Sequence, residues 1–307
     1  MNLLITGGCG FIGSNFINYF SNSINKIVNV DAMYYCANKN NIKIKDKYYF
    51  VKGNICSADL VSHILSEHNI THVIHFAAQS HVQNSFDDSL QYTHDNIVGT
   101  HTLLECCRIW GKIEKFIHIS TDEVYGESGD VKLHEENILI PTNPYAATKA
   151  AAEMIVMSYI KSYNLPIIIT RGNNVYGPNQ YPEKLIPRFI QQLKNKEQVT
   201  IQGDGSAKRS FLHVLDTCSA IELILLHGKV GEIYNIGADD CNEYTVMEIA
   251  KLLVKLIYHT DNFQSYVKFV PDRPFNDSRY FISNEKLKQL GWEIKIPFLD
   301  GIKDLIK

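Results

Sequence analysis

The chain has 307 residues and a formal net charge of −3, so it is long enough to bury a full α/β core with a smaller second lobe. It contains no block of like charge and no apolar run near the ~18 residues of a membrane span, which argues against nucleic-acid and membrane binding. The seven cysteines are irregularly spaced without a C-x-x-C pair, which indicates reduced thiols. Because the N-terminus enters a predicted strand at once, we expect a cytoplasmic protein without a signal peptide.

The first predicted element is a strand at 2–6, which runs into the glycine-rich loop 7–13 and then into a helix at 14–21. The loop sequence GGCGFIG contains the pattern G-x-G-x-x-G. Missing side chains let the backbone turn tightly and approach a pyrophosphate at the helix N-terminus. The next strand, 26–30, ends in Asp31, 18 residues past the last glycine of the loop. An acidic residue there grips an adenosine ribose and repels a 2′-phosphate, so the pattern predicts NAD rather than NADP.

Strands and helices then alternate through the first half of the chain. The predicted strands are 2–6, 26–30, 48–51, 72–76, 115–120 and 166–170, and the predicted helices are 14–21, 57–68, 90–109 and 144–163. This alternation predicts an α/β fold with a doubly wound parallel sheet, the Rossmann type. The helix at 144–163 follows Thr142-Asn143 and begins with proline, a good start signal.

The alternation breaks down after Arg171, where two further helices are predicted at 182–195 and 244–258. We expect a Rossmann domain made of 1–172 and about 209–238, because the apolar stretch 211–226 is expected to return to the sheet. The remaining parts, about 173–208 and 239–307, are expected to form a smaller α/β lobe that binds the substrate.

Two clusters of reactive side chains follow predicted elements of the Rossmann domain. Thr121, Asp122 and Glu123 stand at the end of an apolar run. Tyr145 and Lys149 lie four residues apart, on one face of a helix. The Tyr-Lys pair is suited to removing a proton from a substrate hydroxyl, because a nearby positive charge favours the phenolate. The carboxyl pair is suited to acid–base elimination of water, because a like charge and a dry site keep one acid protonated.

The chain resembles the extended short-chain dehydrogenase/reductases, and among them the nucleotide-sugar 4,6-dehydratases, over nearly its whole length. The stretches that carry the resemblance are 7–13, 76–82, 96–100, 120–126, 145–149, 171–178, 182–187 and 272–274. The Thr-Asp-Glu sequence separates the dehydratases from the 4-epimerases and decarboxylases, which share the Tyr-Lys pair. The stretches 171–178 and 273–277 look more like the eukaryotic-type enzymes, including those that use UDP-glucose, than like the bacterial dTDP-glucose enzymes.

The resemblance implies that UDP-glucose or dTDP-glucose loses water to give the 4-keto-6-deoxyglucose nucleotide. Tyr145 would take the proton of the C4 hydroxyl while hydride moves to NAD, and Lys149 would bond the nicotinamide ribose. Thr121 would hold the C4 oxygen. Glu123 would remove the C5 proton, and Asp122 would protonate the departing C6 oxygen before hydride returns to C6.

The resemblance also implies binding residues. The cofactor residues are Gly7, Gly10, Phe11, Ile12, Gly13, Asp31, Asn54, Ile55, Phe76, Ala77, Ala78, Ser80, Tyr145, Lys149 and Val175. The substrate residues are Ser80, Thr121, Asn174, Lys184, Leu185, Gln202, Arg209, Asn235, Arg273 and Asn276. Five of the six arginines lie between 171 and 279, and arginine is suited to bidentate contact with a diphosphate.

Three positions depart from the family pattern. Asn54 stands where these enzymes usually carry an Asp that faces the adenine amine, although an amide oxygen can still accept that bond. Gln79 replaces the Glu of many bacterial members, and Asp95 replaces a neutral residue. No metal site is expected, because His72 and His75 are three apart on a strand and point to opposite faces.

Two other functions share these features: a nucleotide-sugar 4-epimerase, and a non-catalytic protein that binds NAD or a nucleotide sugar. In this family the helices near 90–109 and 144–163 pair with a second subunit, so the resemblance implies a homodimer with a four-helix bundle. The product is expected to be a precursor of rhamnose, but the sequence leaves open both the base of the nucleotide and the final sugar.

Overall fold

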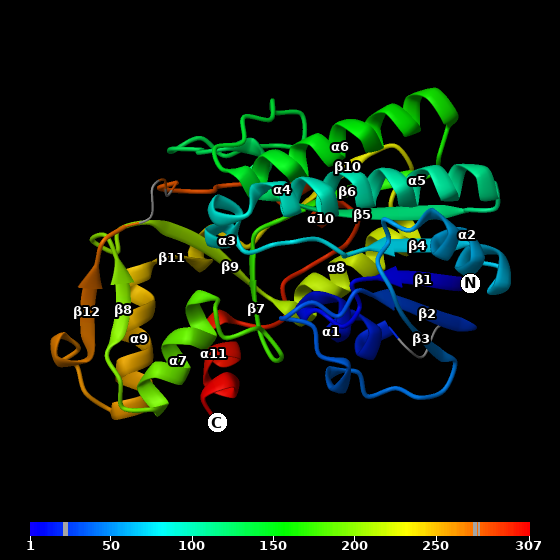
Figure 1. Ribbon diagram of the computed structural model, residues 1–307. Coiled ribbons are helices and arrows are strands. Elements are labelled where there is room, and N and C mark those ends of the chain that lie inside the picture. The colour runs from blue at the N-terminus through cyan, green and yellow to red at the C-terminus, as the bar shows by residue number, and fades with distance from the viewer. Residues whose placement is uncertain (21–23, 273–274, 276) are drawn as a thin grey trace.

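The computed structural model describes residues 1–20, 24–272, 275 and 277–307 (Figure 1). Its main sheet has seven strands, all parallel, in the order β10-β6-β5-β4-β1-β2-β3. The strands are β1 (Asn2–Thr6), β2 (Lys26–Asp31), β3 (Tyr48–Lys52), β4 (His72–His75), β5 (Lys115–Thr121), β6 (Ile167–Gly172) and β10 (Ile233–Ile236). The reversal of strand order beside β1 is that of a doubly wound dinucleotide-binding sheet, which confirms the predicted fold class.

Helices cover both faces of this sheet, as Figure 1 shows. On one face, α1 (Phe11–Phe20) packs against α8 (Val214–His227). On the other face, α5 (Gly99–Trp110) packs between α2 (Ala58–Glu67) and α6 (Pro144–Tyr163). Strand residues alternate between these two cores, so the strands are apolar on both sides, as buried parallel strands are.

The helix predicted at 90–109 is continuous over residues 89–110 of the structure and contains a π-helical turn. It consists of α4 (Ser89–Tyr92), the π-helical turn (Thr93–Val98) and α5, and the short helix α3 (Val82–Asp87) precedes it. Within the turn, the Asn96 amide accepts a hydrogen bond from the Gln79 backbone at 2.7 Å and donates to Thr148 Oγ1 at 2.9 Å. The π-helical turn thus carries two buried polar side chains, Asp95 and Asn96.

The second lobe has its own small sheets and its own core, at the lower left of Figure 1. Its three-stranded sheet consists of β7 (Asn174–Tyr176), β9 (Lys208–His213) and β11 (Glu243–Thr245), and its two-stranded sheet of β8 (Val199–Gln202) and β12 (Val267–Val270). Its helices are α7 (Leu185–Lys194), α9 (Val246–Tyr258) and α11 (Phe298–Ile306). In the described part of the chain, no helix has the length and apolar character needed to cross a membrane.

The chain passes between the two lobes several times. After β9, α8 and β10 return to the main sheet, where β10 pairs with β6. Later, α10 (Glu285–Gln289) packs near β10, and Leu287 and Trp292 join the core of the first lobe. The sequence assigned this last stretch to the second lobe, and the structure places it against the Rossmann core instead.

A buried ion pair ties α6 to β6. Arg171 Nη2 lies 2.7 Å from Glu153 Oε2, and the two side chains are 2 % and 0 % exposed. Arg171 also donates to the Tyr125 hydroxyl at 2.8 Å, while its guanidinium lies over the Tyr125 ring. These contacts fix the helix that carries Tyr145 and Lys149 against the sheet.

Candidate active site

A cavity of about 850 Å³ opens at the carboxyl ends of the main-sheet strands. Residues that follow β1, β2, β4 and β5 line one side of it, and residues of the second lobe line the other. The volume lies within the range of pockets that enclose small molecules and cofactors. The carboxyl edge of an open α/β sheet is also where such folds place their ligands.

The glycine-rich loop forms one end of this cavity. Gly7 has a φ of +71°, and a Cβ added there would lie 2.7 Å from the backbone of Ala77. A Cβ added at Gly13 would lie 2.6 Å from the carbonyl oxygen of Gly7. The loop can therefore pack against β4 and α1 only because these two side chains are missing.

Asp31 lines the cavity at the end of β2 and is held in place by the loop. Its carboxylate accepts hydrogen bonds from the backbone of Cys9 at 2.9 Å and of Met33 at 2.8 Å. Burial raises its pKa from the ordinary value, and these two bonds partly oppose the rise. The two N–H groups fix the orientation of the carboxylate toward the cavity.

The helix α6 brings Tyr145 and Lys149 to the cavity wall. It begins at Pro144, and the Asn143 side chain caps it by accepting from the Ala146 backbone at 2.9 Å. Lys149 Nζ donates to the Ile119 carbonyl at 2.7 Å, and the Tyr145 backbone donates to Ser85 Oγ at 3.2 Å.

Burial dominates the proton affinities of this pair. It lowers the pKa of Lys149 to about 8, although Glu153 acts in the opposite sense. Burial, together with the charge of Glu123, raises the pKa of Tyr145 well above that of a free phenol. Lys149 is not among the groups that act on the Tyr145 pKa, so the lowering predicted from the sequence is not found, and burial sets the direction of the shift.

The two acids follow β5 in a short 3₁₀ turn, Asp122–Tyr125. Burial and the charge of Glu123 raise the pKa of Asp122 to about 7. Asp122 accepts from Asn173 Nδ2 at 2.6 Å and from the Thr121 hydroxyl at 3.2 Å. Burial also raises the pKa of Glu123, whose Oε2 accepts from Asn143 Nδ2 at 3.0 Å.

The cavity brings together most of the residues that the sequence analysis named. Those that line it are Gly7, Gly10, Phe11, Ile12, Gly13, Asp31, Asn54, Ile55, Phe76, Ala77, Ala78, Ser80, Thr121, Glu123, Tyr145, Lys149, Asn174, Val175, Lys184, Leu185, Gln202 and Arg209. Asp122, which lies in the chain between the lining residues Thr121 and Glu123, does not line the cavity itself and is 3 % exposed. Arg273 and Asn276 lie outside the described residues.

Asn235 is the predicted substrate residue that the structure places elsewhere. It is fully buried on β10, accepts from the Tyr125 hydroxyl at 2.9 Å and donates toward the Leu133 carbonyl at 3.4 Å. The nearby Glu135 accepts from its backbone at 2.9 Å. Through these bonds Asn235 connects the loop before α6 to β10 at the sheet edge. Its side chain is buried in the interior, so it does not line the cavity.

Cations of the second lobe face the cavity opposite the sheet. Lys184 Nζ donates to the Ser80 carbonyl at 2.8 Å and so joins the lobes. Arg209 donates to the Asp277 carbonyl at 2.9 Å, and its guanidinium lies over the Tyr280 ring at 4.8 Å. Both side chains belong to the cavity wall.

Sequence reasoning missed several polar residues that organise the acids. Asn173 holds Asp122, and Asn143 holds Glu123 in addition to capping α6. Tyr280 donates to Glu123 Oε2 at 3.4 Å and to Asp277. Asn173 lies in the stretch 171–178 that carries the family resemblance, and Asn143 precedes the helix predicted at 144–163. Only the fold shows which carboxylate each asparagine contacts.

The positions that depart from the family pattern meet at one edge of the cavity. Asn54 Oδ1 already accepts from the Cys56 backbone at 2.8 Å, and Asn54 Nδ2 donates to the Tyr34 hydroxyl at 3.0 Å. Asp95 Oδ2 accepts from Gln79 Nε2 at 2.9 Å. The two substituted residues Gln79 and Asp95 thus pair with each other.

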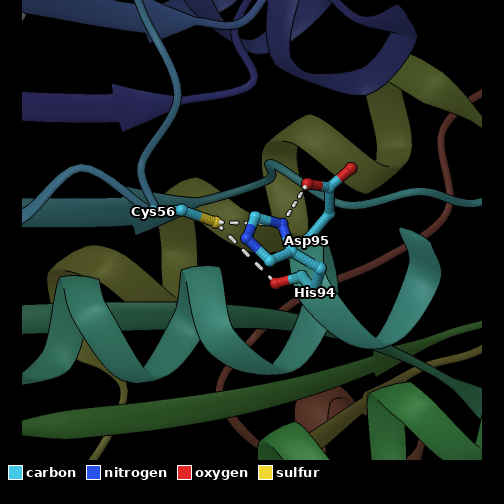
Figure 2. A group of neighbouring side chains, drawn as sticks. All are labelled: Cys56, His94 and Asp95. Atoms are coloured by element: carbon cyan, nitrogen blue, oxygen red, sulfur yellow. Dashed lines mark hydrogen bonds and ion pairs between the residues drawn. The ribbon is translucent and has the colours of Figure 1, made fainter. Parts of the chain in front are cut away.

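Cys56, His94 and Asp95 form a group beside this edge that spacing did not reveal, as Figure 2 shows. His94 Nδ1 lies 3.7 Å from Cys56 Sγ and 3.3 Å from Asp95 Oδ1. Both contacts use the same ring nitrogen, so the group is not arranged as a Cys-His-Asp relay, which needs both nitrogens. Burial acts to raise the Asp95 pKa, but hydrogen bonds to its carboxylate from side chains that include Gln79 and His94 keep that pKa below its usual value.

Comparison with known proteins identifies this architecture. Residues 4–305 match the family described as GDP-mannose 4,6 dehydratase. A trifunctional UDP-glucose 4,6-dehydratase/UDP-4-keto-6-deoxy-D-glucose 3,5-epimerase/UDP-4-keto-L-rhamnose-reductase of Arabidopsis thaliana is 50% identical over an alignment of 310 positions that covers 98% of this chain and 46% of that protein. The chain thus spans about half the length of this relative. The human dTDP-D-glucose 4,6-dehydratase is 43% identical over 99% of this chain and 89% of its own.

A solved structure shares the whole fold. The dTDP-glucose 4,6-dehydratase of Streptomyces venezuelae, with NAD and TYD bound, superposes with a TM-score of 0.93 at 36% identity, covering 100% of this chain and 96% of that one. Sequence match and fold agree over nearly the whole length. The chain therefore belongs to the family described as GDP-mannose 4,6 dehydratase, within the nucleotide-sugar 4,6-dehydratases that its motifs resemble.

Proposed function

We propose that this protein is an NAD-dependent 4,6-dehydratase that removes water from UDP-glucose or dTDP-glucose. The observation that carries the proposal is one cavity that holds the glycine loop, Thr121, Glu123, Tyr145 and Lys149 together, with the buried Asp122 between Thr121 and Glu123 in the chain. The alternative functions lack a use for the two adjacent acids. The relatives named above support the same reaction.

The glycine loop and Asp31 fit NAD. The missing side chains of Gly7 and Gly13 leave the backbone close to the N-terminus of α1, where N–H groups attract a pyrophosphate. The carboxylate of Asp31 suits a free ribose 2′-hydroxyl and repels a 2′-phosphate. NAD, when bound, supplies the hydride acceptor at C4 and the hydride donor at C6.

Tyr145 and Lys149 act on the C4 hydroxyl in this proposal. Tyr145 lies at the cavity wall, where it would take the C4 proton as its phenolate while hydride leaves C4. Lys149 Nζ, anchored on the Ile119 carbonyl, keeps a positive charge nearby in a dry site. Tyr145 and Lys149 thus orient the C4 hydroxyl and exclude water, and neither forms a covalent bond to the sugar.

Glu123 and Asp122 divide the elimination between them. Glu123, oriented by Asn143, removes the C5 proton, whose acidity rises once C4 is a ketone. Asp122, whose pKa near 7 allows it to be protonated at neutral pH, protonates the departing C6 oxygen. Two adjacent carboxyls with different partners can hold different protonation states.

The nucleotide is proposed to lie against the second lobe. Arg209 and Lys184 supply positive charge for the diphosphate, and Asn174, Leu185 and Gln202 line the same wall. Arg273 and Asn276 are proposed to add contacts by the family resemblance. The proposed division is a Rossmann lobe for NAD and a smaller lobe for the nucleotide sugar.

A homodimer through α5 and α6 is also proposed. Val98 in the π-helical turn, Ile109 on α5 and Met154 on α6 are 44%, 70% and 50% exposed. Pairing with the same face of a second copy would bury these side chains in a four-helix bundle.

Mass spectrometry of the purified protein tests the function. The protein is incubated separately with UDP-glucose and dTDP-glucose, first without added NAD and then with it. Loss of one water from either substrate supports the proposal, and the faster substrate names the base. The matched control is Tyr145→Phe, which keeps the ring and removes the hydroxyl. An unchanged mass in every case, or formation of the galactose isomer, would contradict it.

A further inference from the structure

Cys56, His94 and Asp95 bring three kinds of metal-binding side chain together beside the edge of the cavity (Figure 2). One ligand atom of each side chain lies within 4.8 Å of the other two. Cys56 belongs to the loop after β3, and the other two residues belong to the π-helical turn. Because Cys56 and His94 are 38 residues apart in the chain, no local spacing marked the group.

One nitrogen of the His94 ring faces both of the other groups. Nδ1 lies 3.7 Å from Cys56 Sγ and 3.3 Å from Asp95 Oδ1. A histidine binds a metal ion through one nitrogen, so the feature that argues against a relay is one that a metal site requires. Zinc bonds of ~2.3 Å to sulfur and ~2.0 to 2.2 Å to nitrogen and oxygen, at tetrahedral angles, place the nitrogen about 3.6 Å from the sulfur and about 3.4 Å from the oxygen. The two observed distances agree with this geometry.

The Asp95 carboxylate is oriented so that one oxygen is left for a metal ion. Its Oδ2 accepts hydrogen bonds from Gln79 Nε2 and from Gln91 Nε2, both at 2.9 Å. Its Oδ1 has longer contacts, with the Tyr34 hydroxyl and with His94 Nδ1, both at 3.3 Å. Hydrogen bonds of this kind to the second oxygen of a ligating carboxylate hold the ligand in place in metal sites.

Access and charge also suit a cation. The His94 side chain is 55% exposed and that of Asp95 is 8% exposed, so an ion can enter from solvent on the His94 side. A thiolate and a carboxylate on either side of one imidazole repel each other, and a divalent cation between them offsets that repulsion. Thiolate and imidazole ligands favour zinc over Mg²⁺ and Ca²⁺, which prefer oxygen ligands.

We infer that Cys56, His94 and Asp95 form a site for one zinc ion, which ties the loop after β3 to the π-helical turn. Three protein ligands leave the fourth tetrahedral position to water. Asp95 lines the cavity, as do the neighbours of Cys56 in the chain, Asn54 and Ile55, whereas Cys56 and His94 do not. The ion therefore lies in the wall of the cavity, away from the proposed catalytic residues, and holds two segments of that wall together.

Titration of the purified protein, with its bound NAD, tests the site. Metal is first removed with a chelator, and Zn²⁺ is then titrated by calorimetry in the absence of substrate. One ion should bind per chain, and Cys56→Ser should weaken binding by about 100-fold or more, since it removes a ligand. Gln91→Ala removes one bond to Asp95 Oδ2 and should weaken binding by about 10-fold. Cys241→Ser is the matched control, because Cys241 is also a free cysteine and is exposed, and it should bind Zn²⁺ like the wild type.

Cobalt identifies the thiolate ligand directly. Co²⁺ in place of zinc should give the charge-transfer absorption of a cobalt–thiolate bond in the wild type and in Cys241→Ser, and should not give it in Cys56→Ser. Hydrogen exchange locates the ion independently. With Zn²⁺ present, exchange should slow at residues 54–56 and 93–98 of the wild type and stay unchanged in Cys56→Ser.

Absence of Zn²⁺ binding by the wild type would overturn the site, because the contacts would then be hydrogen bonds alone. Equal binding by the wild type and Cys56→Ser would overturn it as well and would indicate an adventitious ion only. If Cys56→Ser does not fold, loss of the thiolate absorption in Cys241→Ser, or its absence in the wild type, would still do so. None of these measurements uses substrate, so a failed dehydration assay would contradict the proposed function instead.

Discussion

Gly7 is the residue at which the cofactor loop comes nearest to the sheet. Two effects oppose a side chain there: a φ of +71° and a distance of 2.7 Å from a new Cβ to the Ala77 backbone. Gly129 offers a comparison, since its φ is +56° but a Cβ would meet nothing within 4 Å. Gly129→Ala should therefore cost only the left-handed strain, on the order of 1 kcal/mol.

Gly7→Ala should cost clearly more, about 2 kcal/mol or above, because the backbone at Ala77, just after β4, must also move. Urea unfolding of both variants measures the difference. Bound NAD, measured by its release on denaturation, should fall in Gly7→Ala and stay at the wild-type level in Gly129→Ala. Equal losses of stability in the two variants would show that the close approach has no effect.

Asp122 links stability to pH. Its folded pKa of about 7 lies above its ordinary value of 3.8, so the folded protein binds this proton more tightly than the unfolded chain. The contribution is complete below pH ~4 and is lost as pH rises through about 7. Glu123, whose pKa is also raised by burial, acts in the same sense.

Asp122→Asn stays neutral and should lose less stability than the wild type between pH 5 and pH 8.5. A relative gain on the order of 1 to 4 kcal/mol is expected, since one pKa unit corresponds to about 1.4 kcal/mol. Thermal melts at both pH values measure it, and Asp261→Asn, at an exposed aspartate, is the control. Parallel changes in the melting temperatures of the wild type and Asp122→Asn would contradict the assignment.

At the scale of elements, the Arg171–Glu153 pair determines how α6 sits on β6. Removing one partner leaves a buried charge without its counter-ion, so Glu153→Gln and Arg171→Met should each cost about 3 to 5 kcal/mol. The double variant should recover much of this loss. Glu105→Gln breaks the exposed Arg108–Glu105 pair on α5 and should cost less than about 1 kcal/mol. Urea unfolding compares them, and additive losses in the double variant would contradict the account.

Helices and strands were predicted best from the sequence where the apolar periodicity and the start signal lie within the element itself. The helix at 144–163 agrees with α6, because Asn143, Pro144 and the apolar pattern all act within the helix itself. The helix predicted at 90–109 contains a π-helical turn whose Asn96 is held by Gln79 and Thr148, both distant in sequence, so no local pattern marked the turn. The strands after residue 171 are short and pair across long gaps, so no local pattern marked them.

The same distinction holds in the active site. Motifs placed Thr121, Glu123, Tyr145 and Lys149 at one cavity, because their positions follow from elements that the sequence shows. The burial of Asn235 depends on β10, a strand that was not predicted. The partners that tune the acids come from other segments of the chain, and spacing along one segment cannot report them.

For the whole molecule, the exposed apolar face of α5 and α6 predicts self-association. Ile109→Glu should convert a dimer to a monomer, because it places a charge in an apolar interface. Light scattering after size-exclusion chromatography measures the mass. Ile138→Glu is the matched control, since Ile138 is 80 % exposed but lies in the loop before α6. A monomeric wild type, or dissociation by both variants, would contradict the expected interface.

The position of β10 in the chain has a consequence for synthesis on the ribosome. Strand β6 is complete at Gly172, but its outer neighbour β10 begins only at Ile233. At about 5 to 20 residues per second, the edge of the sheet waits roughly 3 to 12 s for its last strand. During that time an apolar strand edge is open to pairing with other nascent chains. Yield in cells should therefore depend more on translation speed and chaperone supply than the stability of the finished protein would suggest.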